Sequence, residues 1–144
     1  MSYNAAYAVL EKEEGRLVEL AQKMWDCPET AYNEVNACKW TAELLKEYGF
    51  EVETGYVGLP TAIKATWGSG HPVIGILGEY DALPGMSQKV CPVKDPVELG
   101  APGQGCGHNL LGVASIGAVI GIKAELEAKK LSGTVVYYGC PGEE

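Results

Sequence analysis

Apolar residues recur at helical spacing in three stretches of the chain. The first runs from residue 4 to 26 and stops before Pro28, and the second runs from about Thr30 to Tyr48, with Gly49 placed as a C-cap. The third, from His108 to Lys130, is almost entirely apolar in its first half and charged in its last turns. The pattern therefore predicts three helices.

Four other stretches have the character of strands. Residues 50–54 alternate between apolar and polar side chains, and residues 61–67 are rich in β-compatible types. The runs 72–78 and 134–138 are continuously apolar, which predicts strands buried on both faces. Because helices alternate with buried strands, we expect the α/β class, with helices covering both faces of a mostly parallel sheet.

A long segment separates the third of these strands from the third helix. It runs from Pro84 to Gly107, and its four prolines and several glycines predict a loop without regular structure. Loops of this length inside a compact domain are usually functional.

Composition excludes several classes of partner. Nineteen acidic residues against eleven basic ones give a net charge of −8, which argues against nucleic acid or an anionic membrane. The longest apolar stretch, residues 110–122, is interrupted by glycines and a serine, and we expect it to be too short to span a bilayer. Residues 1–12 contain no apolar core of a secretory signal. Five cysteines without a C-x-x-C pair argue against disulfides or a zinc knuckle, and we expect a cytoplasmic protein.

Side chains able to perform chemistry gather at one predicted edge of the sheet. Asp81 follows the strand that ends at Gly78, and Glu143 and Glu144 follow the strand that ends at Tyr138. Cys106 and His108 lie where the loop enters the third helix. Ligands of open α/β sheets bind beyond the carboxyl ends of the strands, so we expect these segments to converge on a site.

The Cys106-Gly107-His108 triplet can provide two metal ligands. A thiolate and an imidazole two residues apart can reach one cation, with Gly107 letting the backbone bend around it. The alternative is a buried, inert cysteine beside a histidine that caps the helix. For an isolated C-x-H triplet that alternative is favoured by about two to one.

Glu143 and Glu144 suit hydrolysis if they divide the work. In extended backbone the two carboxylates point different ways, so one can bind metal while the other handles protons. The alternative is a solvated acidic turn. Asp81 could orient a ligand histidine, bind metal or stabilise a turn, and Glu79 has the same ambiguity. His71 precedes its strand and is excluded, because six residues of strand place it roughly 20 Å from this edge.

A nucleotide site fails on spacing. His108 stands where the dinucleotide-binding fingerprint needs its third glycine, and no phosphate-binding G-x-x-x-x-G-K-[ST] loop is present.

Three motifs carry a resemblance to a known family. Segments 78–85 (GEYDALPG), 105–112 (GCGHNLLG) and 138–144 (YGCPGEE) resemble the amidohydrolase branch of the aminoacylase and glutamate-carboxypeptidase metallopeptidases, and the likeness extends from Trp25 to Glu144. It implies a three-layer α/β zinc-exopeptidase fold. Residues 1–144 would be the N-terminal part of the catalytic domain, without its C-terminal part or the lid and dimerisation domain.

The resemblance also implies roles for individual residues. Cys106 would be a thiolate shared by two metals, with His108 and Glu144 as further ligands. Glu143 would be the general base, and Asp81 would support the site from behind the ligands. Such proteins bind two zinc or manganese ions, cleave N-acyl amino acids of the p-aminobenzoyl-glutamate kind, and form homo- or hetero-oligomers.

Counting ligands limits what the chain can do alone. With Cys106 shared, His108 and Glu144 leave each metal two protein ligands, whereas a catalytic zinc usually has three and a water. We therefore expect weak metal binding and little hydrolysis. The alternative function is a non-catalytic regulatory or assembly subunit of the same fold; Glu143 favours the enzyme, because a scaffold does not need a base.

Overall fold

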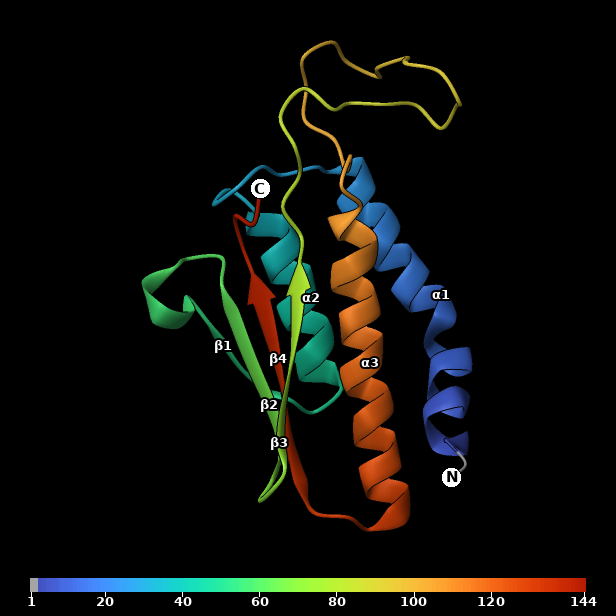
Figure 1. The fold of residues 1–144 in the computed structure, drawn as a ribbon, viewed down its shortest axis with the longest axis vertical. Helices are drawn as coiled ribbons and strands as arrows, with labels where there is room; N and C mark the ends of the chain where they lie inside the picture. The colour runs from blue at the N-terminus through green and yellow to red at the C-terminus, as the bar shows by residue number, and fades with distance from the viewer. Residues whose placement is uncertain (1–2) are drawn as a thin grey trace.

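The structure, a computed structural model, describes residues 3–144 (Figure 1). Its elements follow in the order α1 (Asn4–Asp26), α2 (Val35–Glu47), β1 (Glu51–Thr54), the 3-10 turn η1 (Tyr56–Gly58), β2 (Ile63–Ser69), β3 (Val73–Glu79), α3 (His108–Lys129) and β4 (Gly133–Cys140). All three predicted helices and all four predicted strands are present.

The second helix begins later than its apolar pattern predicted. Thr30 forms a β-bridge with Ala82, and Tyr32 has a positive φ of 61°, so the chain cannot be helical before residue 35. The Glu29 carboxylate then accepts the backbone N–H groups of Asn36 and Ala37, which satisfies two free donors of the first turn. The predicted end is confirmed, because Gly49 has a φ of 80° and donates its N–H to the carbonyl of Lys46.

The four strands form one sheet in the order β1-β2-β4-β3. Strands β3 and β4 are parallel and bring Glu79 level with Cys140, as expected for the predicted site. The pairs β1–β2 and β2–β4 are antiparallel, so the expectation of a mostly parallel sheet is wrong for the strands described in residues 3–144. The sheet is mixed because short connections, rather than crossover helices, join β1 to β2 and β2 to β3.

One hydrophobic core holds the helices against the sheet. It contains side chains of α1, α2 and α3 together with the inward-facing residues of β2 and β4, such as Ala65, Val135 and Tyr137. Helix α1 packs along α3, and α3 lies over β3 and β4 (Figure 1). All three helices therefore share one face of the sheet, and residues 3–144 provide one helical layer and the sheet of the expected three layers.

The two strands predicted to be buried on both faces differ. In β4, Val135, Val136 and Tyr137 are all buried, which confirms the prediction for this central strand. In β3 the prediction is wrong, since Val73 and Leu77 are 56% and 62% exposed. β3 is the last strand of the described sheet, and its outer face carries no helix.

Helix α3 is longer than the apolar stretch inside it. By length and composition alone its 22 residues could cross a membrane, but half of its most apolar window is buried in the fold. Its packing against α1, β3 and β4 makes it the central helix of the core.

The segment between β3 and α3 is the predicted long loop. It has no helix or strand, and it projects beyond the carboxyl ends of β3 and β4 (Figure 1). A bridge between Leu83 and Gly103 joins its two ends, so the loop returns to the sheet edge at which it left.

Candidate metal centre

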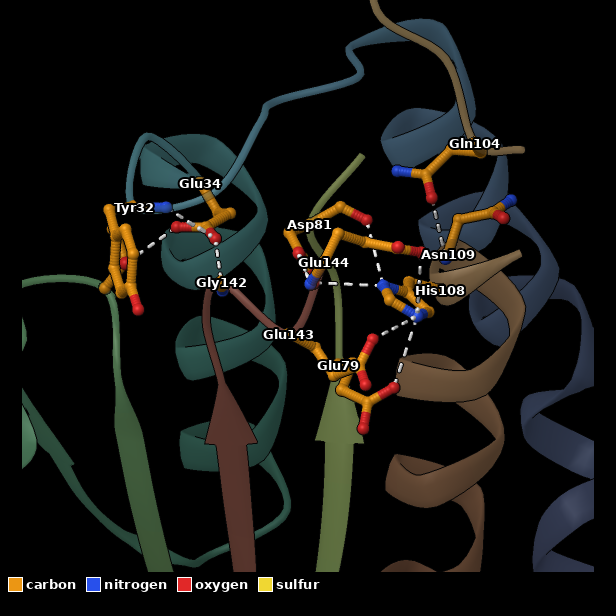
Figure 2. Close-up of polar contacts among 11 residues, drawn as sticks. Tyr32, Glu34, Glu79, Asp81, Gln104, His108, Asn109, Gly142, Glu143 and Glu144 are labelled. Atoms are coloured by element: carbon orange, nitrogen blue, oxygen red, sulfur yellow. Dashed lines mark hydrogen bonds and ion pairs between the residues drawn. The ribbon is translucent and has the colours of Figure 1, made fainter. Parts of the chain in front are cut away.

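His108 is the buried centre of the polar cluster at this edge, with 3% of its surface exposed (Figure 2). Its Nδ1 lies 3.0 Å from Asp81 Oδ1 and 3.1 Å from the Asp81 carbonyl oxygen. Both partners are acceptors, so Nδ1 donates to Asp81, and Nε2 is the ring nitrogen left to bind a metal. Asp81 thereby orients the ring as the carboxylate partners of metal-bound histidines do.

Three carboxylates face the free nitrogen of His108. Nε2 lies 3.3 Å from Glu79 Oε2 and 3.7 Å from the carboxylates of both Glu143 and Glu144 (Figure 2). The three residues come from the end of β3 and from the turn after β4. Among residues 3–144, His108 is the one basic side chain found against these three carboxylates, so while its Nε2 carries no proton the cluster concentrates negative charge that a cation would neutralise.

Two groups of potential metal ligands share His108. The donor atoms of Cys106, His108 and Glu144 all lie within 4.8 Å of one another, and so do those of Glu79, His108 and Glu143. Glu143 and Glu144 fall in different groups, and the predicted division between a metal ligand and a proton carrier stays a prediction. Thiolate, imidazole and carboxylate are the ligands that zinc takes in proteins, so these residues fit a divalent metal.

The thiol of Cys106 is exposed and lies in acidic surroundings. Its hydrogen bond with Glu144 raises its pKa, and the charges of Glu144, Glu143 and Glu79 act in the same direction. The thiol form is therefore favoured in the metal-free chain. A bound cation would reverse this preference, because it stabilises the thiolate.

The first turn of α3 is built to present His108. Gly107, with a φ of 84°, turns the chain into the helix, and its carbonyl accepts the N–H groups of Leu110 and Leu111. The buried Gln104 accepts the N–H of Asn109 through Oε1, which satisfies another free donor of the helix end. His108 is held at the helix start by this capping and by Asp81 behind its ring.

Two carboxylates hold the turn that carries Glu143 and Glu144. Asp81 Oδ2 accepts the N–H of Glu144 at 3.0 Å, and Glu34 Oε1 accepts the N–H of Gly142 at 2.9 Å (Figure 2). Gly142 has a φ of 65°, and a Cβ there would lie 2.6 Å from Tyr32 Cζ. A side chain at this position would have to displace the Tyr32 ring.

The structure brings together every residue that the sequence singled out for the site. Cys106, His108, Glu143 and Glu144 meet at the ends of β3 and β4, and Asp81 lies behind His108. Their roles as ligands or base stay predictions. The sequence left the role of Glu79 open, and the structure places this residue at the end of β3, close to His108. The sequence did not single out Gln104 or Glu34, which lie in other segments.

Comparisons with known proteins agree with this geometry. The chain is 44% identical over 136 residues to a subunit of the p-aminobenzoyl-glutamate hydrolase of Escherichia coli, a match that covers 94% of the chain and 28% of that protein. It is 31% identical to the Xaa-Arg dipeptidase of Mus musculus, over 90% of the chain and 29% of the relative. The chain thus spans less than a third of the length of these curated relatives. No family model matches it.

Solved structures share the fold. An aminohydrolase from methicillin-resistant Staphylococcus aureus superposes with a TM-score of 0.77 at 27% identity, over 97% of this chain and 35% of that one. A dinuclear metal-binding peptidase of the M20 family from Bacillus subtilis superposes with a TM-score of 0.71 at 26% identity. The match covers 92% of this chain and 36% of that one.

The fold comparison confirms the predicted α/β class. In sequence and structure the chain is similar to part of each of these longer proteins, one of which is a peptidase of the M20 family.

Proposed function

We propose that the chain supplies the N-terminal part of the catalytic domain of a metal-dependent amidohydrolase. One observation carries the proposal: Asp81 aims the free nitrogen of His108 at a point that Cys106 and Glu144 also reach. The substrate would be an N-acyl amino acid of the p-aminobenzoyl-glutamate kind, as the name of the Escherichia coli relative suggests. The dipeptidase relatives broaden this class to amide bonds of amino acids in general.

The residues of the site divide the work of hydrolysis. Cys106, His108 and Glu144 would hold two divalent cations, whose charge would polarise a substrate carbonyl and acidify a water molecule. Glu143 takes the proton from that water and returns it to the leaving amine. Its side chain is about half exposed, so it can face substrate. Asp81 fixes the ring of His108 and, through the N–H of Glu144, the backbone of the acidic turn.

The ligand set favours zinc, because thiolate and imidazole suit it better than they suit manganese. Glu79 is a further candidate ligand, since its carboxylate lies within the second group around His108. It would raise the number of protein ligands at one cation from two to three. Manganese remains the alternative metal of the proposal.

The proposed domain contains further elements outside this chain. Support comes from the length of the relatives and from the open face of β3, where Val73 and Leu77 are exposed. The Escherichia coli relative is named as one subunit of its enzyme, which supports assembly of the longer protein into an oligomer. All five cysteines are free thiols, which supports a reducing, cytoplasmic setting.

Alkylation of the cysteines tests the metal site without an assay of activity. Cys106 and Cys91 are both exposed, and Cys91 lies in the long loop away from the ligands. We expect zinc to slow iodoacetamide labelling of Cys106 and to leave Cys91 unchanged, as measured by peptide mass spectrometry. Equal labelling of Cys106 with and without saturating zinc would contradict the site.

Turnover tests the ligand count. With zinc or manganese and p-aminobenzoyl-glutamate, we expect little or no hydrolysis by the chain alone, because each cation has too few protein ligands. Robust turnover that Glu143→Gln leaves intact would remove the proposed base. Robust turnover that Glu143→Gln abolishes would keep the base and show that the count of ligands is wrong.

A further inference from the structure

Glu34 is a buried carboxylate outside the metal centre. Its side chain belongs to the loop before α2 and has no exposed surface, and among residues 3–144 no ion pair is found for it. Burying a carboxylate is costly unless hydrogen bonds replace the lost water. What Glu34 binds therefore indicates what its burial is for.

Three donors from three separate segments converge on this carboxylate. Oε1 accepts the N–H of Tyr32 and the N–H of Gly142, each at 2.9 Å, and Oε2 accepts the hydroxyl of Thr61 at 2.8 Å. Tyr32 and Thr61 lie in loops beside the sheet edge. Gly142 directly precedes Glu143, so Glu34 joins these two loops to the acidic turn. Figure 2 shows its bonds to Tyr32 and Gly142.

The acidic turn is consequently held at both ends. Glu34 binds the N–H of Gly142, and Asp81 binds the N–H of Glu144, with Glu143 between them. The backbone after β4 forms no regular structure, so these two bonds replace the strand ladder as the restraint on the turn. We propose that Glu34 is a positioning residue, which sets where Glu143 and Glu144 stand relative to His108.

The expected effect of Glu34 on metal binding and rate rests on the proposed function, whereas its hydrogen bonds to the acidic turn do not. Displacing a reacting group by about 1 Å can cost two orders of magnitude in rate, and loss of a residue that orients ligands typically weakens metal binding 10- to 100-fold. Among residues 3–144, the Glu34 carboxylate is found bonded to Tyr32, Thr61 and Gly142 and to no proposed ligand side chain, so an effect on metal passes either through the backbone of the turn or through the charge of Glu34.

Glu29 offers a matched control in the same loop. Its carboxylate also accepts backbone N–H groups, those of Asn36 and Ala37 at 2.9 Å, but these belong to the first turn of α2. Within the described part of the chain, its side chain is found bonded to Asn36 and Ala37 and not to the acidic turn. Glu29→Ala therefore destabilises the same region without releasing Gly142.

The variants to compare are Glu34→Ala, Glu34→Gln and Glu34→Asp, in the 15N-labelled chain. Glutamine keeps the length, so its oxygen can still accept from Gly142 while its amide donates to the Thr61 hydroxyl. Aspartate keeps the charge but loses the reach. A positioning role predicts that glutamine rescues the turn and aspartate does not, whereas a role of charge alone predicts the reverse.

Two readouts decide the matter. Without metal, we expect the Gly142 and Glu144 amide resonances to shift in Glu34→Ala and Glu34→Asp, but not in Glu29→Ala. With zinc, measured by competition against a chromophoric chelator, we expect affinity to fall about tenfold or more in the Ala and Asp variants and to stay within about threefold of the parent in Glu34→Gln.

Several results would overturn the proposal. They are an unmoved Glu144 resonance in Glu34→Ala, equal losses of zinc affinity in Glu34→Ala and Glu29→Ala, or better binding by Glu34→Asp than by Glu34→Gln. If Glu34→Ala does not fold, the comparison of Gln with Asp decides. If the parent binds no zinc, the proposed function fails, and the Gly142 and Glu144 resonances still decide the role of Glu34.

Discussion

The two faces of the sheet are made of similar apolar residues, but helices cover only the inner face (Figure 1). On the inner face, Val135 and Tyr137 are fully buried against the helices. On the outer face of β3, Val73 and Leu77 are mostly exposed, although they are just as apolar. The difference shows that hydrophobicity along a strand reports which faces can be covered, while the neighbouring elements decide which faces are covered in this chain.

The candidate site lies at the edge of the sheet formed by the carboxyl ends of β3 and β4. His108 opens α3 on the covered side, and Glu79 and the acidic turn come from the ends of the strands. Packing on the covered face should therefore dominate stability, while charge and hydrogen bonding at the edge should dominate metal binding. Substitutions in the core, at the candidate site and on the exposed face test this difference.

Truncation of Ile116 should give the largest effect. This side chain lies at the centre of α3 with no exposed surface, so Ile116→Ala removes buried contacts and leaves a cavity. We expect the free energy of unfolding in urea to fall by about 2–5 kcal/mol. Leu111→Ala, at an exposed position of the same helix, is the control and should cost far less. Similar losses for the two variants would mean that the helix does not pack as described.

Asp81→Asn should act on the edge rather than on the core. An amide presents one oxygen and one donor where His108 Nδ1 and the N–H of Glu144 both need an acceptor. If the donor faces His108, the ring must protonate Nε2 and loses its lone pair for metal. We expect zinc affinity to fall about 10- to 100-fold, with a smaller change in unfolding free energy. Asp95→Asn, which alters an exposed ion pair with Lys89, should leave zinc affinity unchanged, and equal losses would point to net charge instead of orientation.

The sequence predicted the ligand cluster because its members follow strands or open a helix. Asp81, His108 and Glu144 stand at ends of regular elements, where the chain direction alone assigns them to one edge. The sequence did not identify Glu34 as part of the site, because the apolar pattern around it predicted a helix from about Thr30, and that helix begins only at Val35. Its partner Gly142 is distant in the sequence, and no local pattern encodes a hydrogen bond between two loops.

The sheet also depends on contacts between distant segments that no local pattern encodes. The continuous apolar runs of β3 and β4 are alike in sequence, yet only β4 lies between two strands. Strand order depends on long-range pairing, which periodicity within a segment does not contain. The mixed direction of the sheet, set by β1 and β2, was missed for this reason.

Ser115→Ala tests how α3 is fastened to β3. Its hydroxyl donates to the carbonyl of Leu77 at 2.7 Å on the covered side of the strand. Losing this bond should lower the unfolding free energy by about 0.5–1.5 kcal/mol. Thr134→Val removes an exposed hydroxyl bond to Gly70 and should cost less, as measured in the same urea titration. If the two variants lose the same unfolding free energy, the partly buried position of Ser115 does not strengthen its hydrogen bond.

Leu77→Ala should give the smallest change in unfolding free energy. It tests directly whether the outer face of β3 is uncovered in solution. Leu77 and its neighbour Ile76 are aliphatic side chains of equal size that point to opposite sides of β3, and only Ile76 packs against the core. We expect Leu77→Ala to change the unfolding free energy by no more than about 0.5 kcal/mol, since an exposed side chain has few contacts to lose. Ile76→Ala should cost distinctly more. If instead Leu77→Ala cost as much as Ile76→Ala in the dilute chain, something would already cover the outer face, and the contrast between the two sides of the sheet would not hold in solution.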